Sequence, residues 1–352
     1  MLSGGIFRRN IVVTIKDVAK LAGVAVSTAS NALNGKYGVK PETRRRVLEA
    51  AKKLNYVPNP IAQGLVTKST KNISIIVSGP SSFNLFNNPV FFEVIKSIAQ
   101  HLNSQGYQAH LNIISTEEEE KAIPRIAQSR STDAMILVGS RRNDRDLAQL
   151  LEEIAIPSLV VIRPSPSDKV YAVSSNNWKC GYMATRHLID LGHREISFIG
   201  VLPGVSIAEE RLAGYRFALE EAGLTFNESL VIPGDFYQES GLTGVRQLLR
   251  QASPIPTAIF TANDLMALGA LEGLEQEGIR VPDDISIIGS DNIPNLHLLK
   301  VPLTTIATPF FEIGKLAAQK ITGILEGNDT LPSKIVVESE LRIRSSTRKM
   351  EV

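Results

Sequence analysis

Two hydrophobic patterns divide the chain near residue 72. Before that point apolar residues recur at helical spacing, as in Val18, Leu21 and Ala22, which we expect on one face of a helix beginning after Thr14. From Ile73 onward the apolar residues instead gather in short β-branched runs, separated by amphipathic stretches. Buried runs that alternate with helices predict parallel α/β sheets.

The second pattern predicts alternating strands and helices over residues 72–345. We expect strands at 73–77, 134–138, 159–162, 196–199, 258–260 and 285–288. Helices are expected at 89–103, 179–191, 211–222 and 264–277, followed by the helix-ending glycines Gly106, Gly192, Gly223 and Gly278. This span is longer than one such sheet needs, so we expect two lobes, with a ligand cleft at the carboxyl ends of the strands.

Residues 14–58 have the layout of a helix-turn-helix. Gly23 and Val24 form the expected turn, and a second helix follows at about 26–33. Ser27, Ser30 and Asn31 project outward from this second helix, which enters the DNA major groove in such motifs. A third helix, at 41–54, carries five basic residues that suit phosphates.

Charge is distributed unevenly between the two regions. Residues 1–72 hold 13 Lys/Arg against three Asp/Glu, a net charge of +10, and the remainder holds 25 against 33, a net charge of −8. A basic segment beside an acidic body is typical of a nucleic-acid-binding module joined to another domain.

Composition narrows the remaining classes. The chain is 43% hydrophobic and 21% charged, and none of its apolar runs reaches the roughly 18 residues of a membrane span. We expect a cytoplasmic protein without a membrane partner, because no signal-peptide segment follows Arg8 and Arg9. The five histidines lack metal-ligand spacing and no catalytic motif is visible, so we expect no metal, no cofactor and no enzymatic activity.

The stretches TIKDVAKLAGVAVSTASNALNG and TRRRVLEAAKKLNYVPNPIAQGL closely resemble the lactose/galactose repressor family. The resemblance implies a dimeric bacterial transcription regulator, a repressor, that binds double-stranded operator DNA. It also implies a hinge helix and linker at 59–71, in which the hinge helix, residues 59–65, enters the minor groove and inserts a leucine. The DNA contacts implied by position are Thr14, Val26, Ser27, Thr28, Ser30, Asn31, Asn34, Asn59, Ala62 and Leu65.

Two departures from the family pattern change what we expect of DNA binding. Asn31 stands where many members carry arginine, and an asparagine amide matches adenine rather than guanine. Gly64 lies inside the expected hinge helix, where it costs about 1 kcal/mol relative to alanine.

The resemblance continues through segments such as NNPVFFEVI, ERLAGYRFALEEAGL and FTANDLMALGALEGLEQEGIRVPDDISIIGSDN. It implies a periplasmic-binding-protein-like domain of two lobes that binds a small effector. A sugar suits the chemistry, because carboxylates, amides and arginine bind vicinal hydroxyls and an aromatic face packs on the ring. The implied ligand contacts are Val90, Phe91, Arg163, Arg211, Phe236, Asn263, Asp264 and Asp291.

Several alternatives stay open at this point. NNPVFF with Val161-Ile162-Arg163-Pro164 resembles maltose-type repressors and favours a glucoside, whereas a purine corepressor is the runner-up effector. A sugar-transport binding protein would have the same two-lobed domain. Such a protein needs a signal peptide and has no use for a helix-turn-helix. We expect a basic tail at 1–13, a second tail at 346–352, and no tetramerising helix after Arg348.

Overall fold

The computed structural model describes residues 13–35, 37–57, 69–79, 88–139 and 144–350, and divides the chain into two compact units, 1–70 and 71–352. Each unit has its own hydrophobic core. The DNA-contact residues expected at Asn59, Ala62 and Leu65 lie outside the described residues, as does the tail expected before Val13.

The described part of the first unit folds as three helices, α1 (Ile15–Ala22), α2 (Val26–Leu33) and α3 (Pro41–Lys53). Thr14 precedes α1, and its backbone N–H and hydroxyl both donate to the Asp17 carboxylate, at 2.9 and 2.8 Å. Gly23 makes the turn to α2 in the left-handed region, at φ 62°. The fold class of a small helical head and an α/β body is therefore as predicted.

One detail of the head differs from our expectation. Leu21 is 52% exposed, although we placed it on the inner face of α1 with Val18 and Ala22. Ala19 takes that place and is buried. The neighbouring helices therefore meet α1 on the face of Val18, Ala19 and Ala22, which puts Leu21 at the solvent side.

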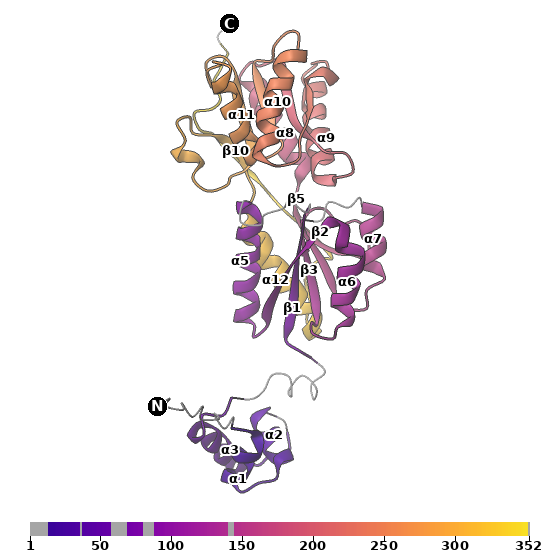
Figure 1. Ribbon diagram of the computed structural model, residues 1–352, viewed down its shortest axis with the longest axis vertical. Coiled ribbons are helices and arrows are strands. Elements are labelled where there is room, and N and C mark those ends of the chain that lie inside the picture. Colours follow the sequence, from indigo (N-terminus) through magenta and orange to yellow (C-terminus); the bar gives the residue numbers. More distant parts are fainter. Residues whose placement is uncertain (1–12, 36, 58–68, 80–87, 140–143, 351–352) are drawn as a thin grey trace, which may run out of the picture. The chain divides into compact units, whose positions relative to one another are not determined.

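The second unit contains two six-stranded sheets, each with helices on both faces (Figure 1). The first lobe has the strand order β11-β5-β4-β3-β1-β2. Its helices α5 and α12 cover one face of the sheet, and α6 and α7 cover the other. Its elements are β1 (Asn72–Gly79), α5 (Pro89–Ser104), β2 (Gln108–Ser115), α6 (Glu119–Gln128), β3 (Ala134–Val138), α7 (Asp144–Glu152), β4 (Ser158–Ile162), β5 (Tyr171–Ser175), α12 (Phe310–Glu326) and β11 (Lys334–Val337).

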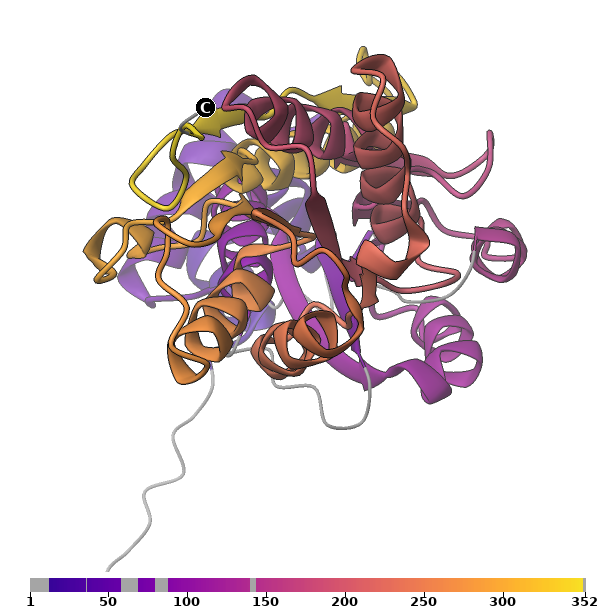
Figure 2. The ribbon, with the colours of Figure 1, turned by 90° about the horizontal axis from the view of Figure 1, so that it is seen from above.

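The second lobe has the strand order β12-β10-β9-β8-β6-β7, with α8 and α9 on one face and α10 and α11 on the other (Figure 2). All strand pairs are parallel except the pair β10–β12. The elements are α8 (Asn177–Asp190), β6 (Ile196–Val201), α9 (Ser206–Glu221), β7 (Val231–Pro233), α10 (Gln238–Gln251), β8 (Ala258–Thr261), α11 (Asp264–Gln276), β9 (Ser286–Asp291), β10 (Thr304–Ala307) and β12 (Glu340–Arg342).

The chain passes between the lobes three times, after β5, after β10 and after β11. Every strand and helix expected in the body is present, although α9 begins five residues before the expected start at Arg211. The four expected helix-ending glycines all have positive φ angles. Among the described residues, no helix combines the length and the apolar character needed to cross a membrane.

The expected tail at 346–352 is wrong for its described part, because residues 346–350 pack against the second lobe. Ser346 is fully buried, its carbonyl accepts from the Ile287 N–H at 2.8 Å, and its hydroxyl donates to the Ile287 carbonyl at 2.6 Å. The Met350 N–H donates to the Leu191 carbonyl at 2.8 Å. The segment therefore satisfies backbone groups beside β9 and belongs to the body.

Candidate functional site

A cavity in the second unit gathers most of the expected ligand residues. Both lobes contribute to its lining, and the carboxyl ends of β1, β3, β4 and β9 reach it. Seven of the eight expected residues line this cavity, namely Val90, Phe91, Arg163, Arg211, Phe236, Asn263 and Asp291. Such an edge of parallel strands is where open α/β sheets bind ligands.

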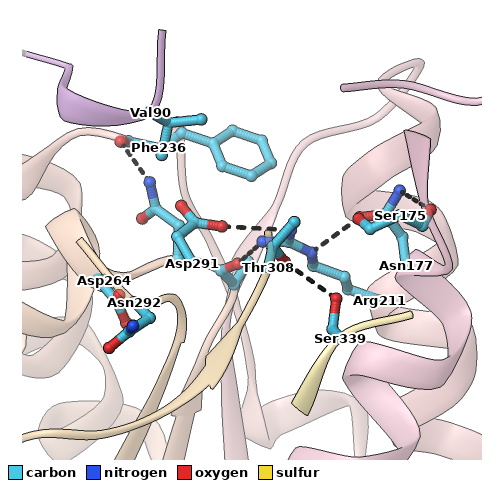
Figure 3. Close-up of polar contacts among 12 residues, drawn as sticks. Val90, Ser175, Asn177, Arg211, Phe236, Asp264, Asp291, Asn292, Thr308 and Ser339 are labelled. Carbon is cyan, nitrogen blue, oxygen red and sulfur yellow. Dashed lines mark hydrogen bonds and ion pairs between the residues drawn. The ribbon is translucent and has the colours of Figure 1, made fainter. Parts of the chain in front are cut away.

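Arg211 organises the polar side of the cavity (Figure 3). This side chain leaves α9 and is only 3% exposed. Its Nε donates to the Asn177 side-chain oxygen at 3.2 Å, and its Nη1 donates to the Ala262 carbonyl. Its Nη2 lies 3.4 Å from the Asp291 Oδ1. Three acceptors thus hold the guanidinium in one orientation before any ligand arrives.

Asp291 is the carboxylate on this side of the cavity. It ends β9, is 7% exposed, and has a φ angle of 124°, a backbone conformation that side-chain-bearing residues rarely adopt. Burial raises the pKa of Asp291 to about 7, although Arg211 opposes this rise and Asp264 adds to it. The Asp291 Oδ1 accepts one hydrogen bond from Arg211, and the carboxyl group has the capacity for further hydrogen bonds to a ligand.

Asp264 is the one expected ligand residue that does not line the cavity. It is fully buried, its Oδ1 accepts from the Thr305 hydroxyl at 2.6 Å, and its Oδ2 accepts from the Ile293 N–H at 3.0 Å. We expected Asp264 to contact the ligand directly, and this expectation is wrong for this cavity. Asp264 is the first residue of α11, and its side chain is directed away from the cavity, toward Thr305 and Ile293. Asp264 instead holds the loop that follows Asp291.

Asn263 links two parts of the site. Its side-chain oxygen caps α11 by accepting from the Met266 N–H at 2.9 Å, and its Nδ2 donates to the Phe236 carbonyl at 3.0 Å. Phe236 has a φ angle of 71° and presents its ring to the cavity edge (Figure 3). The cap therefore fixes the position of an aromatic side chain in a strained backbone conformation.

The first lobe supplies a more apolar wall. The Phe91 ring lies directly over Gly139, where a Cβ would be only 2.5 Å from the ring. Arg163 follows β4, is 3% exposed, and its Nη2 donates to the Ser206 hydroxyl of the other lobe at 3.4 Å. Ile162, just before it, has a φ angle of 75°, which is strained for a β-branched residue.

Sequence reasoning missed several lining residues, including Ser78, Tyr237 and Phe310. Ser78 is the penultimate residue of β1 and is fully buried, and its hydroxyl has no hydrogen-bond partner within the part of the chain that the structure describes. A polar residue at the carboxyl end of a predicted strand was the available signal. Phe310 enters through the crossing from β10 to α12, which no local pattern predicts.

The candidate nucleic-acid interface lies on α2. Val26 is 43% exposed, Ser27 is also exposed, and Asn31 is half-buried, whereas Ala29 points into the head core. The Asn34 amide donates to the Ser30 hydroxyl at 3.4 Å. The structure thus brings the expected contacts of α2 together on its outer side, with Thr28 half-buried and Thr14 exposed before α1.

Arg46 joins α3 to the end of α1. Its guanidinium donates to the Ala22 carbonyl at 2.6 Å, so it neutralises the negative end of that helix instead of projecting freely. Within the described residues, no group of three or more His, Cys, Asp or Glu side chains is placed to hold a metal ion.

Comparison with known proteins identifies the family. Residues 14–59 match the model of bacterial regulatory proteins of the lacI family, and residues 185–347 match a periplasmic binding protein-like domain. The HTH-type transcriptional repressor PurR of Haemophilus influenzae (strain PittEE) is 36% identical over 342 residues, 96% of this chain and 99% of that protein. The chain belongs to the lacI family.

Other lacI-family proteins are similar over nearly the whole chain. The HTH-type transcriptional regulator CelR of Thermobifida fusca is 35% identical over 335 residues, 95% of this chain and 98% of its own. The structure of the lac repressor dimer bound to operator and an anti-inducer is 26% identical, with a TM-score of 0.82, covering 96% of this chain and 99% of that one. This lacI-family chain is therefore a sequence-specific DNA-binding transcriptional regulator whose DNA affinity responds to a small ligand.

Proposed function

We propose that the effector is a sugar, that it binds in the cavity around Arg211 and Asp291, and that the protein represses transcription as a homodimer on a pseudo-palindromic operator. The single observation that carries the sugar is the buried Arg211–Asp291 pair, which offers oriented donors and acceptors beside the Phe236 ring. Vicinal hydroxyls require both kinds of group, and the apolar face of a sugar ring suits an aromatic neighbour.

Similar structures support this class of ligand. One is a CelR–cellobiose complex, 33% identical with a TM-score of 0.73 and covering 95% of this chain and 99% of that one. Another is a lacI-family regulator from Enterococcus faecium with bound ribose, 26% identical with a TM-score of 0.68, covering 79% and 100%. The proposal concerns the class of ligand and covers both larger and smaller sugars.

The size of the cavity supports a mechanism of control. Its volume is about 90 Å³, whereas sites for small ligands commonly measure about 300–1,000 Å³. A sugar must therefore move the lobes or the side chains that line the cavity. If the lobes move, the three crossings that join them allow a rotation or opening of one lobe against the other, as in hinged binding domains.

A thermal-shift screen of mono- and disaccharides and of purine bases tests the effector class. We expect a sugar to raise the melting temperature of the wild type and not that of Asp291→Asn, since a ligand at 100 times its dissociation constant stabilises by about 2.7 kcal/mol. If purines stabilise the protein and sugars do not, the effector is a purine, the alternative given above, and not a sugar. A shift of equal size in Asp291→Asn would remove the proposed site.

A further inference from the structure

Helix α12 joins the ligand cavity to the residue at which the body begins. Phe310 at its first position lines the cavity, and Glu326 at its last position lies beside Lys71, the first residue of the second unit. Seventeen residues at 1.5 Å each make a rod about 25 Å long. The segment that leads to the DNA-binding helices therefore adjoins the far end of a helix whose near end lines the cavity.

Lys71 is held at this end by contacts to three segments, which are the last residue of α12 and the residues shortly before β2 and β3. Its ammonium lies 4.1 Å from the centroid of the Tyr107 ring and 4.0 Å from the Glu326 carboxylate. The Tyr107 hydroxyl donates to the same Glu326 oxygen at 3.5 Å. The Lys71 N–H donates to the Asp133 carboxylate at 2.9 Å, and its φ angle of 54° is unusual for a lysine. Its backbone direction thus depends on its neighbours.

The N-terminal part of α12 is packed closely against α5, which also begins at the cavity, and the two helices lie side by side (Figure 1). At Gly314 an added Cβ would be 2.6 Å from the Val94 carbonyl, so the two backbones are in direct contact. The Ser97 hydroxyl donates to the Phe311 carbonyl at 2.6 Å. A close-packed helix pair moves as one body, because tightly packed interfaces do not deform gradually.

We propose that Lys71 is a positioning residue for regulated DNA binding. Displacement of Phe310 in the cavity moves α12 along its axis, and Glu326 carries the movement to Lys71, which sets the direction in which the linker leaves the body. The proposal rests on the proposed function, since it requires that events in the cavity change DNA affinity. The contacts of Lys71 with Glu326 and Tyr107 then differ between the two states, which is what coupling requires.

A double-mutant cycle on the full chain tests the coupling without a known effector. The probe is duplex DNA that the wild type selects from a random pool, and affinity is measured by fluorescence anisotropy. Phe310→Ala changes the cavity end of α12 and should alter wild-type affinity by at least about threefold. In the Lys71→Met background the same substitution should alter it by less than about 1.5-fold, whereas Lys71→Arg should keep the effect.

Lys334→Met is the matched control, because Lys334 is also a partly exposed lysine of the first lobe but is paired with Asp168, which is not a residue of α12. It should leave the effect of Phe310→Ala unchanged. An equal effect of Phe310→Ala in the wild type and in Lys71→Met overturns the proposal, as does no effect in the wild type. If Phe310→Ala fails to fold, Phe310→Leu takes its place in the same cycle. A wild type that selects no DNA overturns the proposed function. This result can be distinguished from the two outcomes that overturn only the role of Lys71.

Discussion

Arg211 is the residue on which the polar half of the cavity depends. Its three nitrogens each donate to a different acceptor, on α8, after β8 and at the end of β9. Removing the guanidinium would leave the Asp291 carboxylate and two other oxygens buried without a donor. A buried charge that loses its partner is costly, unlike an exposed one.

We predict that Arg211→Ala lowers the free energy of unfolding by about 3–5 kcal/mol at pH 8, above the Asp291 pKa of about 7. Arg216→Ala on the same helix is the matched control, because Arg216 is 57% exposed and pairs with Glu220 one turn later. The control should lose less than about 1 kcal/mol, including its contact with the Phe226 ring. Urea unfolding of both variants provides the measurement, and equal losses would contradict the buried ion pair.

Asp291 predicts a dependence of stability on pH. Its pKa is raised to about 7 in the fold, above the ordinary value of 3.8, so the folded state binds its proton more tightly than the unfolded chain. The stability contributed by the protonated carboxyl is therefore lost as the pH rises from about 4 to about 7. Asn cannot ionise. The free energy of unfolding of Asp291→Asn, relative to that of the wild type, should therefore be higher at pH 8 than at pH 5.

Urea unfolding at the two pH values measures this difference. Asp284→Asn is the control, because the Arg280 side chain lowers the pKa of the exposed Asp284 to about 2. Asp284 is ionised in both states at pH 5 and at pH 8, so its substitution should have nearly the same effect at both. An Asp291→Asn difference that is also independent of pH would mean that the Asp291 carboxyl is ionised throughout.

The residues of the site were predictable where they stand at the ends of predicted elements. Arg211, Asn263 and Asp291 belong to this group. The family resemblance assigned them by position, and all three line the cavity. The direction of a side chain was harder to predict, since Asp264 follows Asn263 yet turns toward Thr305 behind the cavity. Ser78 and Phe310 became site residues only through the packing of distant segments.

At the scale of elements, the sequence predicts the inner strands that are rich in apolar residues. The strands β1, β3, β4, β6, β8 and β9 are of this kind, and all were expected. The inner strands β5 (Tyr-Ala-Val-Ser-Ser) and β10 (Thr-Thr-Ile-Ala) are more polar and were not expected, although they are largely buried. The edge strand β2 was not expected either, because its side chains alternate weakly between exposed and half-buried positions. The antiparallel pair of β10 and β12 forms only because the chain crosses to the second lobe after β11. A local sequence pattern does not predict such a crossing.

Helix α2 predicts the base preference of the operator. Asn31 lies on its outer side near the exposed Ser27 and Val26, and the asparagine amide matches the N6/N7 edge of adenine. We predict that Asn31→Arg shifts preference toward guanine at one position of each half-site, by about 1–3 kcal/mol. Selection from random DNA with both proteins measures the shift, and identical half-site preferences would assign Asn31 to backbone contacts.

At the scale of the whole molecule, the first lobe carries an exposed apolar surface. Phe92 on α5 is 54% exposed, and Leu111 and Ile113 on the edge strand β2 are 47% and 53% exposed. An edge strand with apolar side chains is a liability for a monomer, so we expect a second copy to cover it. This surface is therefore the proposed dimer face.

We predict that light scattering gives twice the chain mass of 38.4 kDa for the wild type and the monomer mass for Ile113→Glu. Phe217→Glu is the matched control, because Phe217 is an exposed apolar residue of the other lobe, at 45%, and should leave the dimer intact. A dimer that persists in Ile113→Glu would place the interface elsewhere.

Control of DNA affinity by a sugar bound at Asp291 can be measured in a single titration. Anisotropy of the DNA selected by the wild type is followed while each sugar of the screen is added to the wild type and to Asp291→Asn. We predict that at least one sugar changes wild-type affinity by about fivefold or more and leaves the affinity of Asp291→Asn unchanged. DNA affinity that no sugar changes, or that changes equally in both proteins, would contradict it.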